Sequence, residues 1–223
     1  MLSKKQNFFS IVLVGRPNPQ ILNHDFLVRN GILPDEPPFT QDEQEEETPF
    51  TKFFSTPPVA QIEYGDYALL VQEDRYQAID SSGNVPTASP IIDITKRYFG
   101  DVLKYTPFAR GGLNLNCDLS FEDQEDILML DEAIGIDRPK ASSAFDAENP
   151  ILSTTANFPF LKGRLSVAIS KPKDTEKPVK AHFNYEFDFH VDMSLKSFLA
   201  SLDSIDRVSE YCFSFFKRIG VSI

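Results

Sequence analysis

Polar and apolar residues alternate most regularly along residues 180–192, with the sequence KAHFNYEFDFHVD. From His182 onward every second side chain is polar, and the side chains between them are aromatic or aliphatic. Because side chains of a β-strand point alternately to opposite faces, this pattern predicts one strand with a buried aromatic face and a polar face. The polar face would carry His182, Asn184, Glu186, Asp188, His190 and Asp192.

Several other segments also have the composition or alternation of strands. In the segment TPFARGGLNLNCDLS, Leu113, Leu115 and Cys117 would lie on one face, and Asn114 and Asn116 on the other. The segment LKGRLSVAISK precedes the alternating stretch, and a charged turn would join the two into an antiparallel hairpin. The remaining predicted strands are residues 8–15, 59–65, 67–72 and 75–80.

Helical spacing and capping signals predict four helices between or after these strands. Asn23 or Asp25 would begin a short helix that ends near Gly31, and Pro90 would begin a second helix. Ser120 with Asp123 forms a capping signature for a helix over about residues 121–132. Residues 194–219 would form a long amphipathic helix. This order predicts an α+β fold with a mostly antiparallel sheet, helices packed on one face and a long C-terminal amphipathic helix.

The length of 223 residues is compatible with a single domain over residues 1–223. Residues 133–162 are rich in Pro, Ser, Ala and Asn, so we expect an irregular connection and a possible subdomain boundary there. The order of strands followed by a helix occurs twice, at residues 59–105 and 163–219. An internal duplication would produce this order, although the two segments share no residue-level repeat.

The formal net charge is −11, and it is concentrated in one segment. Residues 35–47 contain seven acidic residues and no basic residue, which leaves about −4 for the rest of the chain. We expect residues 35–49 to form a mobile acidic loop. This charge distribution argues against direct binding of nucleic acid or an anionic membrane, since both require basic surface. It leaves open a basic protein partner that binds residues 35–47 and 122–132 as a mimic of nucleic-acid charge.

The N-terminal apolar run and the cysteines indicate where the protein resides. The run from Phe8 to Val14 is short and has no small-residue cleavage site after it, so it predicts a buried strand rather than a signal peptide. No stretch approaches the roughly 18 apolar residues of a membrane span. Cys117 and Cys212 occupy apolar positions and are expected to be free buried thiols. The sequence therefore predicts a cytoplasmic protein.

Two segments carry a likeness to a known family. One is KYTPFARGGLNLN, where a helix is followed by a strand with Gly near its start. The other runs from NYEFDFHVD to SIDRVSEYCFSFF, an aromatic and acidic strand that leads into an amphipathic helix. Together they cover about half of the chain, and they resemble a sporadically distributed, uncharacterised family of small bacterial α+β proteins. The resemblance implies the same fold class and a bacterial setting that includes phage defence. It implies no site residues.

The polar face of residues 182–192 is the main candidate for chemistry. His182, Asp188, His190 and Asp192 offer nitrogen and oxygen ligands of the kind that Zn²⁺ accepts, which would suit a metal-assisted hydrolase. A half-solvated strand gives the same alternation without any site, and we prefer that reading. The stretch Arg110-Gly111-Gly112 could bind a phosphate or could mark close packing, and packing is the commoner reason. No nucleophile or cofactor motif is present, so we expect no cofactor and favour a protein that is not an enzyme.

Aromatic residues crowd the end of the predicted C-terminal helix. Phe213 and Phe216 lie beside its apolar stripe, which gives four aromatic residues within six positions: Tyr211, Phe213, Phe215 and Phe216. This surplus predicts a surface for a protein partner or a homo-oligomer at Tyr211, Phe213 and Phe216. Packing of residues 59–105 against the same helix is the alternative. The leading hypothesis is a protein-interaction module that is a subunit or accessory component of a bacterial complex.

Overall fold

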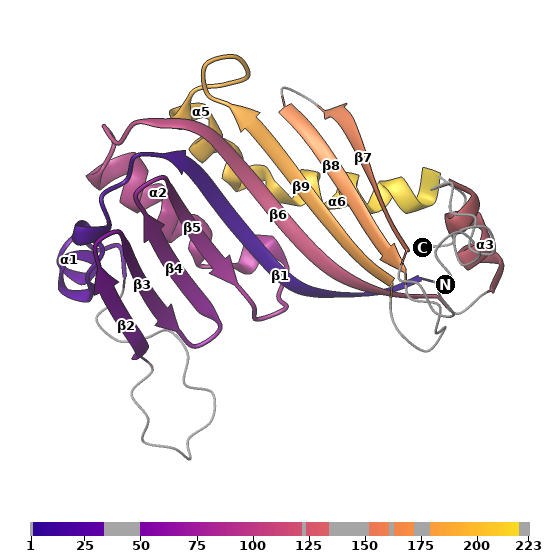
Figure 1. Cartoon of the computed structure of the whole chain (residues 1–223), viewed down its shortest axis with the longest axis horizontal. Coiled ribbons are helices and arrows are strands. Elements are labelled where there is room, and N and C mark those ends of the chain that lie inside the picture. Colours follow the sequence, from indigo (N-terminus) through magenta and orange to yellow (C-terminus); the bar gives the residue numbers. More distant parts are fainter. Residues whose placement is uncertain are drawn as a thin grey trace.

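The computed structural model describes residues 2–33, 50–121, 124–133, 152–160, 163–171 and 179–218. Nine strands of this part form a single antiparallel sheet in the order β2-β3-β4-β5-β1-β6-β9-β8-β7 (Figure 1). The strands are β1 (Leu2–Gly15), β2 (Phe50–Thr56), β3 (Val59–Tyr64), β4 (Tyr67–Gln72), β5 (Arg75–Asp80), β6 (Phe108–Phe121), β7 (Leu152–Phe160), β8 (Gly163–Lys171) and β9 (Val179–Asp188).

Short helices and helical turns occupy several of the connections, and two longer helices lie between β6 and β7 and after β9. Asn23 begins α1 as predicted, because its side chain accepts a hydrogen bond from the N–H of Phe26 at 2.8 Å. Gly31 follows α1 with a positive φ of 65°. The helices and helical turns are η1 (Pro19–Ile21), α1 (His24–Arg29), η2 (Pro86–Ala88), α2 (Ile91–Lys96), the π-helical turn η3 (Arg97–Val102), α3 (Gln124–Ala133), α5 (Leu195–Ser201), η4 (Leu202–Ser204) and α6 (Ile205–Arg218).

The sheet is built from two halves with a similar order of elements, five strands in the first and four in the second. The first half runs from β1 through α1 and the strands β2 to β5 into α2, and the second runs from β6 through α3 and the strands β7 to β9 into α5. In each half the first strand pairs with the last, as β1 with β5 and β6 with β9. The two first strands pair with each other from Leu2 opposite Phe121 to Gly15 opposite Phe108. An internal duplication would produce such an order, although these halves have other bounds than the segments 59–105 and 163–219 and unequal numbers of strands, so the duplication stays a prediction.

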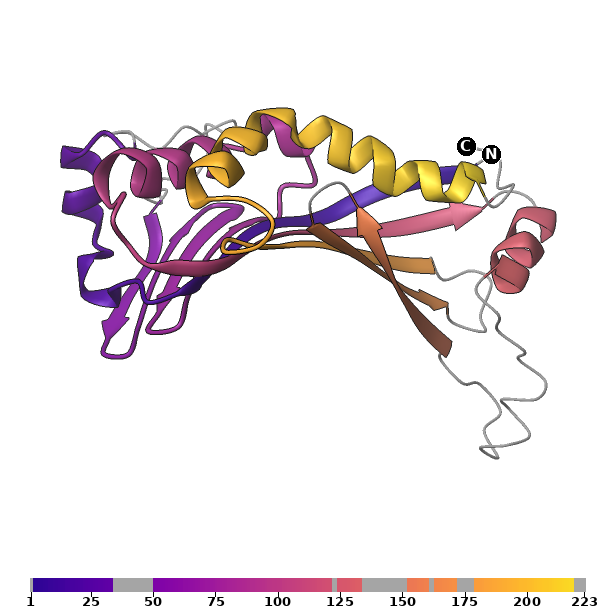
Figure 2. The same ribbon diagram turned by 90° about the horizontal axis from the view of Figure 1, so that it is seen from above.

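Three of the helices, α2, α5 and α6, lie on one side of the sheet, while α3 lies beyond the ends of the strands. Figure 2 shows α2, α5 and α6 above the strands, and it shows that the sheet arches away beneath them. The opposite face is therefore concave, and no helix of the described ranges covers it. The predicted fold class is confirmed: an antiparallel sheet carries helices on one face and ends in the α5–α6 helix. None of the helices described is long and apolar enough to pass through a membrane.

The core lies between the sheet and these helices, and alternation along the strands supplies it. On β9 the aromatic side chains Phe183, Tyr185 and Phe187 are buried, as the sequence pattern predicts. On β6 the apolar and polar faces are also the predicted ones. Cys117 is buried, in line with its apolar position.

Two parts of the predicted organisation need comment. The segment 133–162 was expected to be irregular, but Leu152–Phe160 forms β7, which pairs with β8 at one edge of the sheet. Its Ser and Thr residues fit an edge strand, and turn-rich composition alone did not reveal it. The acidic segment 35–49 falls outside the described residues, as do residues 134–151, so the subdomain boundary and the mobile loop stay predictions.

Candidate functional site

The predicted strand 182–192 ends earlier than expected, and this separates its two histidines. β9 stops at Asp188, and the next four residues form a turn. Oδ1 of Asp188 accepts a hydrogen bond from the N–H of His190 at 2.8 Å. Oδ2 of Asp192 accepts one from the N–H of Asp188 at 2.7 Å. The two carboxylates therefore stabilise a turn, and His190 and Asp192 do not continue the polar face of the strand.

His182 lies far from that turn, so the four candidate metal ligands do not converge. His182 and Asp188 are six positions apart along the strand, a span of about 20 Å. No group of three or more His, Cys, Asp or Glu side chains able to hold a metal occurs in the described part of the chain. His24 does not supply a missing ligand at the strand, because its Nε2 is hydrogen-bonded to the hydroxyl of Tyr64 at 2.8 Å. This geometry gives the metal-hydrolase hypothesis no support.

His182 has a defined environment of its own on the concave face. Its Nδ1 is hydrogen-bonded to Oδ1 of Asn116, which lies opposite it on β6. The ring is half-buried, and this burial lowers the pKa of His182 from its ordinary value. The imidazole is therefore neutral at pH 7.

The Arg110-Gly111-Gly112 stretch is used for packing and for an ionic contact. A Cβ on Gly111 would lie 2.6 Å from Cζ of Phe189, so the absence of a side chain lets this ring lie against the strand. Arg110 and Arg164 both donate to the carboxylate of Glu186, at 3.3 and 2.7 Å. The carboxylate thus links β6, β9 and β8, and close packing is the reading that the structure supports for this stretch.

The aromatic residues of the C-terminal helix were predicted to be a docking surface, and the structure places them in the core instead. Phe216 is 0% exposed and Phe213 is 7% exposed. Both rings pack against Phe183, with ring centroids 6.3 and 5.9 Å apart. Tyr211 is half-buried and stacks under the guanidinium of Arg218. Phe213 and Phe216 therefore leave no free aromatic surface, and the predicted interaction surface at these residues is corrected.

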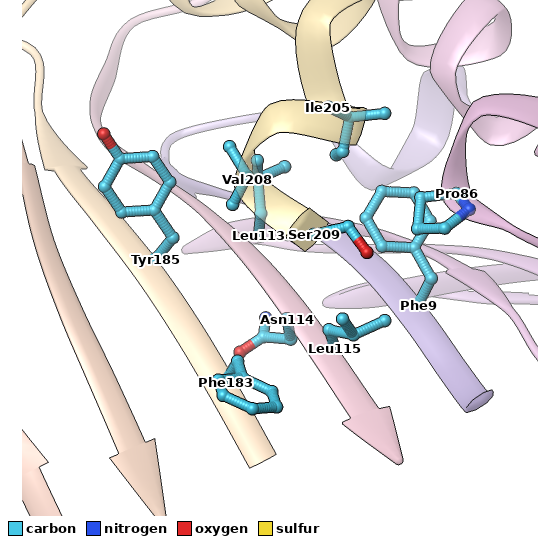
Figure 3. Close-up of a pocket in the computed structure, with 10 residues that line it drawn as sticks. All are labelled: Phe9, Pro86, Leu113, Asn114, Leu115, Phe183, Tyr185, Ile205, Val208 and Ser209. Carbon is cyan, nitrogen blue, oxygen red and sulfur yellow. The ribbon is translucent and has the colours of Figure 1, made fainter. Parts of the chain in front are cut away.

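One cavity lies inside this core, between α6 and the sheet. Figure 3 shows Phe9, Leu113, Phe183, Ile205 and Val208 around it. Its volume is about 20 Å³, which is roughly the space of one water molecule. The lining is almost entirely apolar, so the cavity is a packing defect beneath the helix and no ligand site.

The concave face has an uncharged centre. Register pairing places ten side chains in two neighbouring rows across β4, β5, β1, β6, β9 and β8, and none carries a charge at pH 7. Nine of them are partly exposed, and Ser10 lies buried beneath its neighbours. Charged residues border these rows. Glu63 on β3 pairs with Ala68 at the end of the first row, Glu186 and Arg164 pair with each other in the row beyond the first, and Asp118 and Lys180 pair in the row beyond the second. We call the ten residues the neutral strip: Ala68, Ile79, Ser10, Asn114, Asn184 and Ser166 in one row, and Phe8, Asn116, His182 and Ala168 in the next.

A depression of about 410 Å³ lies at one end of the neutral strip. Its walls come from four strands, with Phe8 on β1, Asn116 on β6, Ala168 on β8 and His182 on β9. The sequence analysis placed the polar residues of β6 and β9 on one face, but the hollow depends on the arch of the sheet and on the small side chains of β8. Neither property can be read from alternation along a single strand.

No protein-family model matches this chain, and no curated protein shows significant similarity to it. The resemblance to the bacterial α+β family therefore stays a prediction. The function has to be argued from the concave face itself.

Proposed function

We propose that the protein is a non-enzymatic interaction module that binds a convex surface of a protein partner in the concave face of its sheet. The observation that carries this proposal is the neutral strip. Charged residues make up 25% of the chain, yet none lies among the ten side chains at the centre of the face. Depletion of charge at the centre with a charged rim is typical of protein–protein interfaces.

The shape and charge of the face define the partner further. Two concave faces fit each other poorly, so the occupant is a convex element of a protein partner rather than the same face of a second copy. Amide side chains such as Asn114 and Asn184 would donate to and accept from its backbone or polar side chains. The overall charge of −11 and the uncharged centre disfavour nucleic acid.

A charge placed in the strip tests this proposal. Asn184→Lys would bury an unpaired ammonium under the partner and weaken binding about 100-fold or more. Ser204→Lys adds the same charge on the exposed η4 turn and is the matched control. Proteins retained from a lysate of the source organism by the wild type and by Ser204→Lys, but lost with Asn184→Lys, are then purified and their affinities measured. If every retained protein binds Asn184→Lys as tightly as the control, the concave face is not the interface.

Self-association through the β2 edge is a second candidate. β2 is the outermost strand at one edge of the sheet, and its neighbouring residues Phe53 and Phe54 are 45% and 53% exposed. They point to opposite faces, so only a strand added alongside β2 would cover both. Sedimentation of the Phe53→Lys variant tests this candidate. The control is Val85→Lys, which alters an exposed apolar residue away from β2. A monomeric wild type at all concentrations would exclude it.

The remaining sequence hypotheses have tests of their own. Charge mimicry depends on residues 35–47, which lie outside the described ranges, and deletion of residues 41–47 would abolish binding of a basic partner without changing the melting temperature. Elemental analysis of the purified protein tests the metal-hydrolase hypothesis. A stoichiometric transition metal that disappears in His190→Ala would favour it.

A further inference from the structure

The depression at the end of the neutral strip has the size and lining of a pocket for a single side chain. Its volume of about 410 Å³ falls within the range of roughly 300–1,000 Å³ that ligand pockets occupy. Ala168 and Ser170 on β8 are small, which leaves space beside the longer side chains of β9. Phe8, on β1, contributes an aromatic ring to the opposite side.

His182 has one hydrogen-bond acceptor that no described residue uses. The side-chain oxygen of Asn116 can only accept, so Nδ1 of His182 carries the proton in their hydrogen bond. In a neutral imidazole the other nitrogen, Nε2, is then an acceptor. Among the described residues Nε2 has no hydrogen-bond partner. A half-buried acceptor beside an aromatic ring is suited to a donor that is itself attached to an apolar group.

The charges at the edge of the depression cancel. Lys180 and Asp118 lie opposite each other on β9 and β6, and they form no ion pair within 4.0 Å in the described ranges. Their opposite signs leave the lining without net charge, which favours a neutral ligand over an anion or a cation. Among protein side chains, tryptophan and tyrosine combine a large ring with a donor, and both are enriched at the energetic centres of interfaces.

We propose that this depression is the anchor pocket for a tryptophan side chain of the protein partner, whose indole N–H donates to Nε2 of His182 while its ring packs on Phe8. Tryptophan fits better than tyrosine because the indole nitrogen only donates and its ring covers more area. This inference rests on the proposed function and names the chemistry of the contact that would hold the partner.

The chain contains no Trp, so indole fluorescence can report on an added probe alone. The probe is N-acetyl-tryptophanamide, and its 1-methylindole analogue has the same ring without the donor. The wild type should bind N-acetyl-tryptophanamide about fivefold more tightly than the 1-methylindole analogue, because one hydrogen bond contributes a difference of that size. His182→Ala should remove this preference, and His190→Ala, which removes an exposed imidazole from the turn after β9, should keep it.

A second variant guards against loss of folding in His182→Ala. Ala168→Leu fills the depression from β8 without removing the acceptor, and it should abolish saturable binding of both probes while the melting transition stays cooperative. Equal affinity for the two probes, unchanged binding by His182→Ala, or no saturable binding to the wild type would each overturn the anchor pocket. The concave interface would survive such a result, because Asn184→Lys tests it with the partner itself.

Discussion

Replacement of Phe216 by alanine distinguishes a core residue from a docking residue. The side chain is 0% exposed and packs edge-on against Phe183, with ring planes at 88°. Removal of a fully buried phenylalanine costs about 3–5 kcal/mol through lost burial and the cavity that remains. For a chain of this size, each kcal/mol lowers the melting temperature by roughly 2–4 °C, so Phe216→Ala should melt about 10 °C lower.

The matched control is Phe54→Ala, because Phe54 is 53% exposed on the edge strand β2. The same chemical change there should cost about 1 kcal/mol or less. Urea unfolding followed by circular dichroism measures both variants and also shows whether the slope with denaturant is unchanged. The free energy of unfolding of Phe54→Ala should lie within about 1 kcal/mol of that of the wild type. If the value for Phe216→Ala is equally close, then α6 does not pack on β9 in the way described.

Three further predictions concern the sheet. Gly111→Ala should lower the free energy of unfolding by about 1–3 kcal/mol, because its Cβ would lie 2.6 Å from the ring of Phe189. Gly112→Ala should be close to neutral, because the nearest atom to its Cβ would lie 3.5 Å away. Thermal unfolding compares the two variants. Burial lowers the pKa of His182, so the unfolded chain binds the proton more readily, and stability should fall as the pH drops below the ordinary histidine value of 6.5. Unfolding of His182→Gln over the same pH range should lack that part of the decline, with the facing groups Asp118 and Lys180 left unchanged. Arg164→Ala removes an exposed ion pair with Glu186 and should lower the stability only slightly, with a smaller effect in high salt. A loss of stability that salt leaves intact would contradict a simple ion pair.

Much of the fold could be predicted from the sequence because alternation and helical spacing report directly on burial. The aromatic residues of β9 and the leucines of β6 are buried where the pattern placed them. Capping chemistry located the start of α1 at Asn23 in the same way. The strands β3, β4 and β5 were separated correctly because Gly65-Asp66 and Glu73-Asp74 interrupt the apolar runs.

The errors arose where two structures give the same pattern. Asp188 and Asp192 look like polar positions of a strand, but aspartates also accept hydrogen bonds from backbone N–H groups, and here they close a turn. On α6 the buried face passes from Ile205 through the half-buried Ser209 to Phe213, and a hydrophobic pattern does not count a serine. The apolar stripe predicted from the sequence therefore did not coincide with the buried face of α6, and Phe213 and Phe216 were predicted to lie outside the core.

The candidate site could be predicted only in part. The pattern identified His182, Asn184 and the asparagines of β6 as one polar face. It could not reveal that six strands join to give an uncharged centre, because that depends on the register between strands distant in sequence. The arch of the sheet, which makes the face concave, is a property of the whole assembly of strands.

The pairing of β1 with β6 has a consequence for how the molecule can be assembled. Within the part of the chain that the structure describes it is the only strand pair that joins the two halves of the sheet, and it extends over the whole length of both strands. The covalent link between the halves, residues 103–107, includes the well-exposed Tyr105. Two polypeptides divided there would each retain the strand that recognises the other, and their reassociation would restore the sheet. The link then acts mainly by raising the effective concentration of one half near the other.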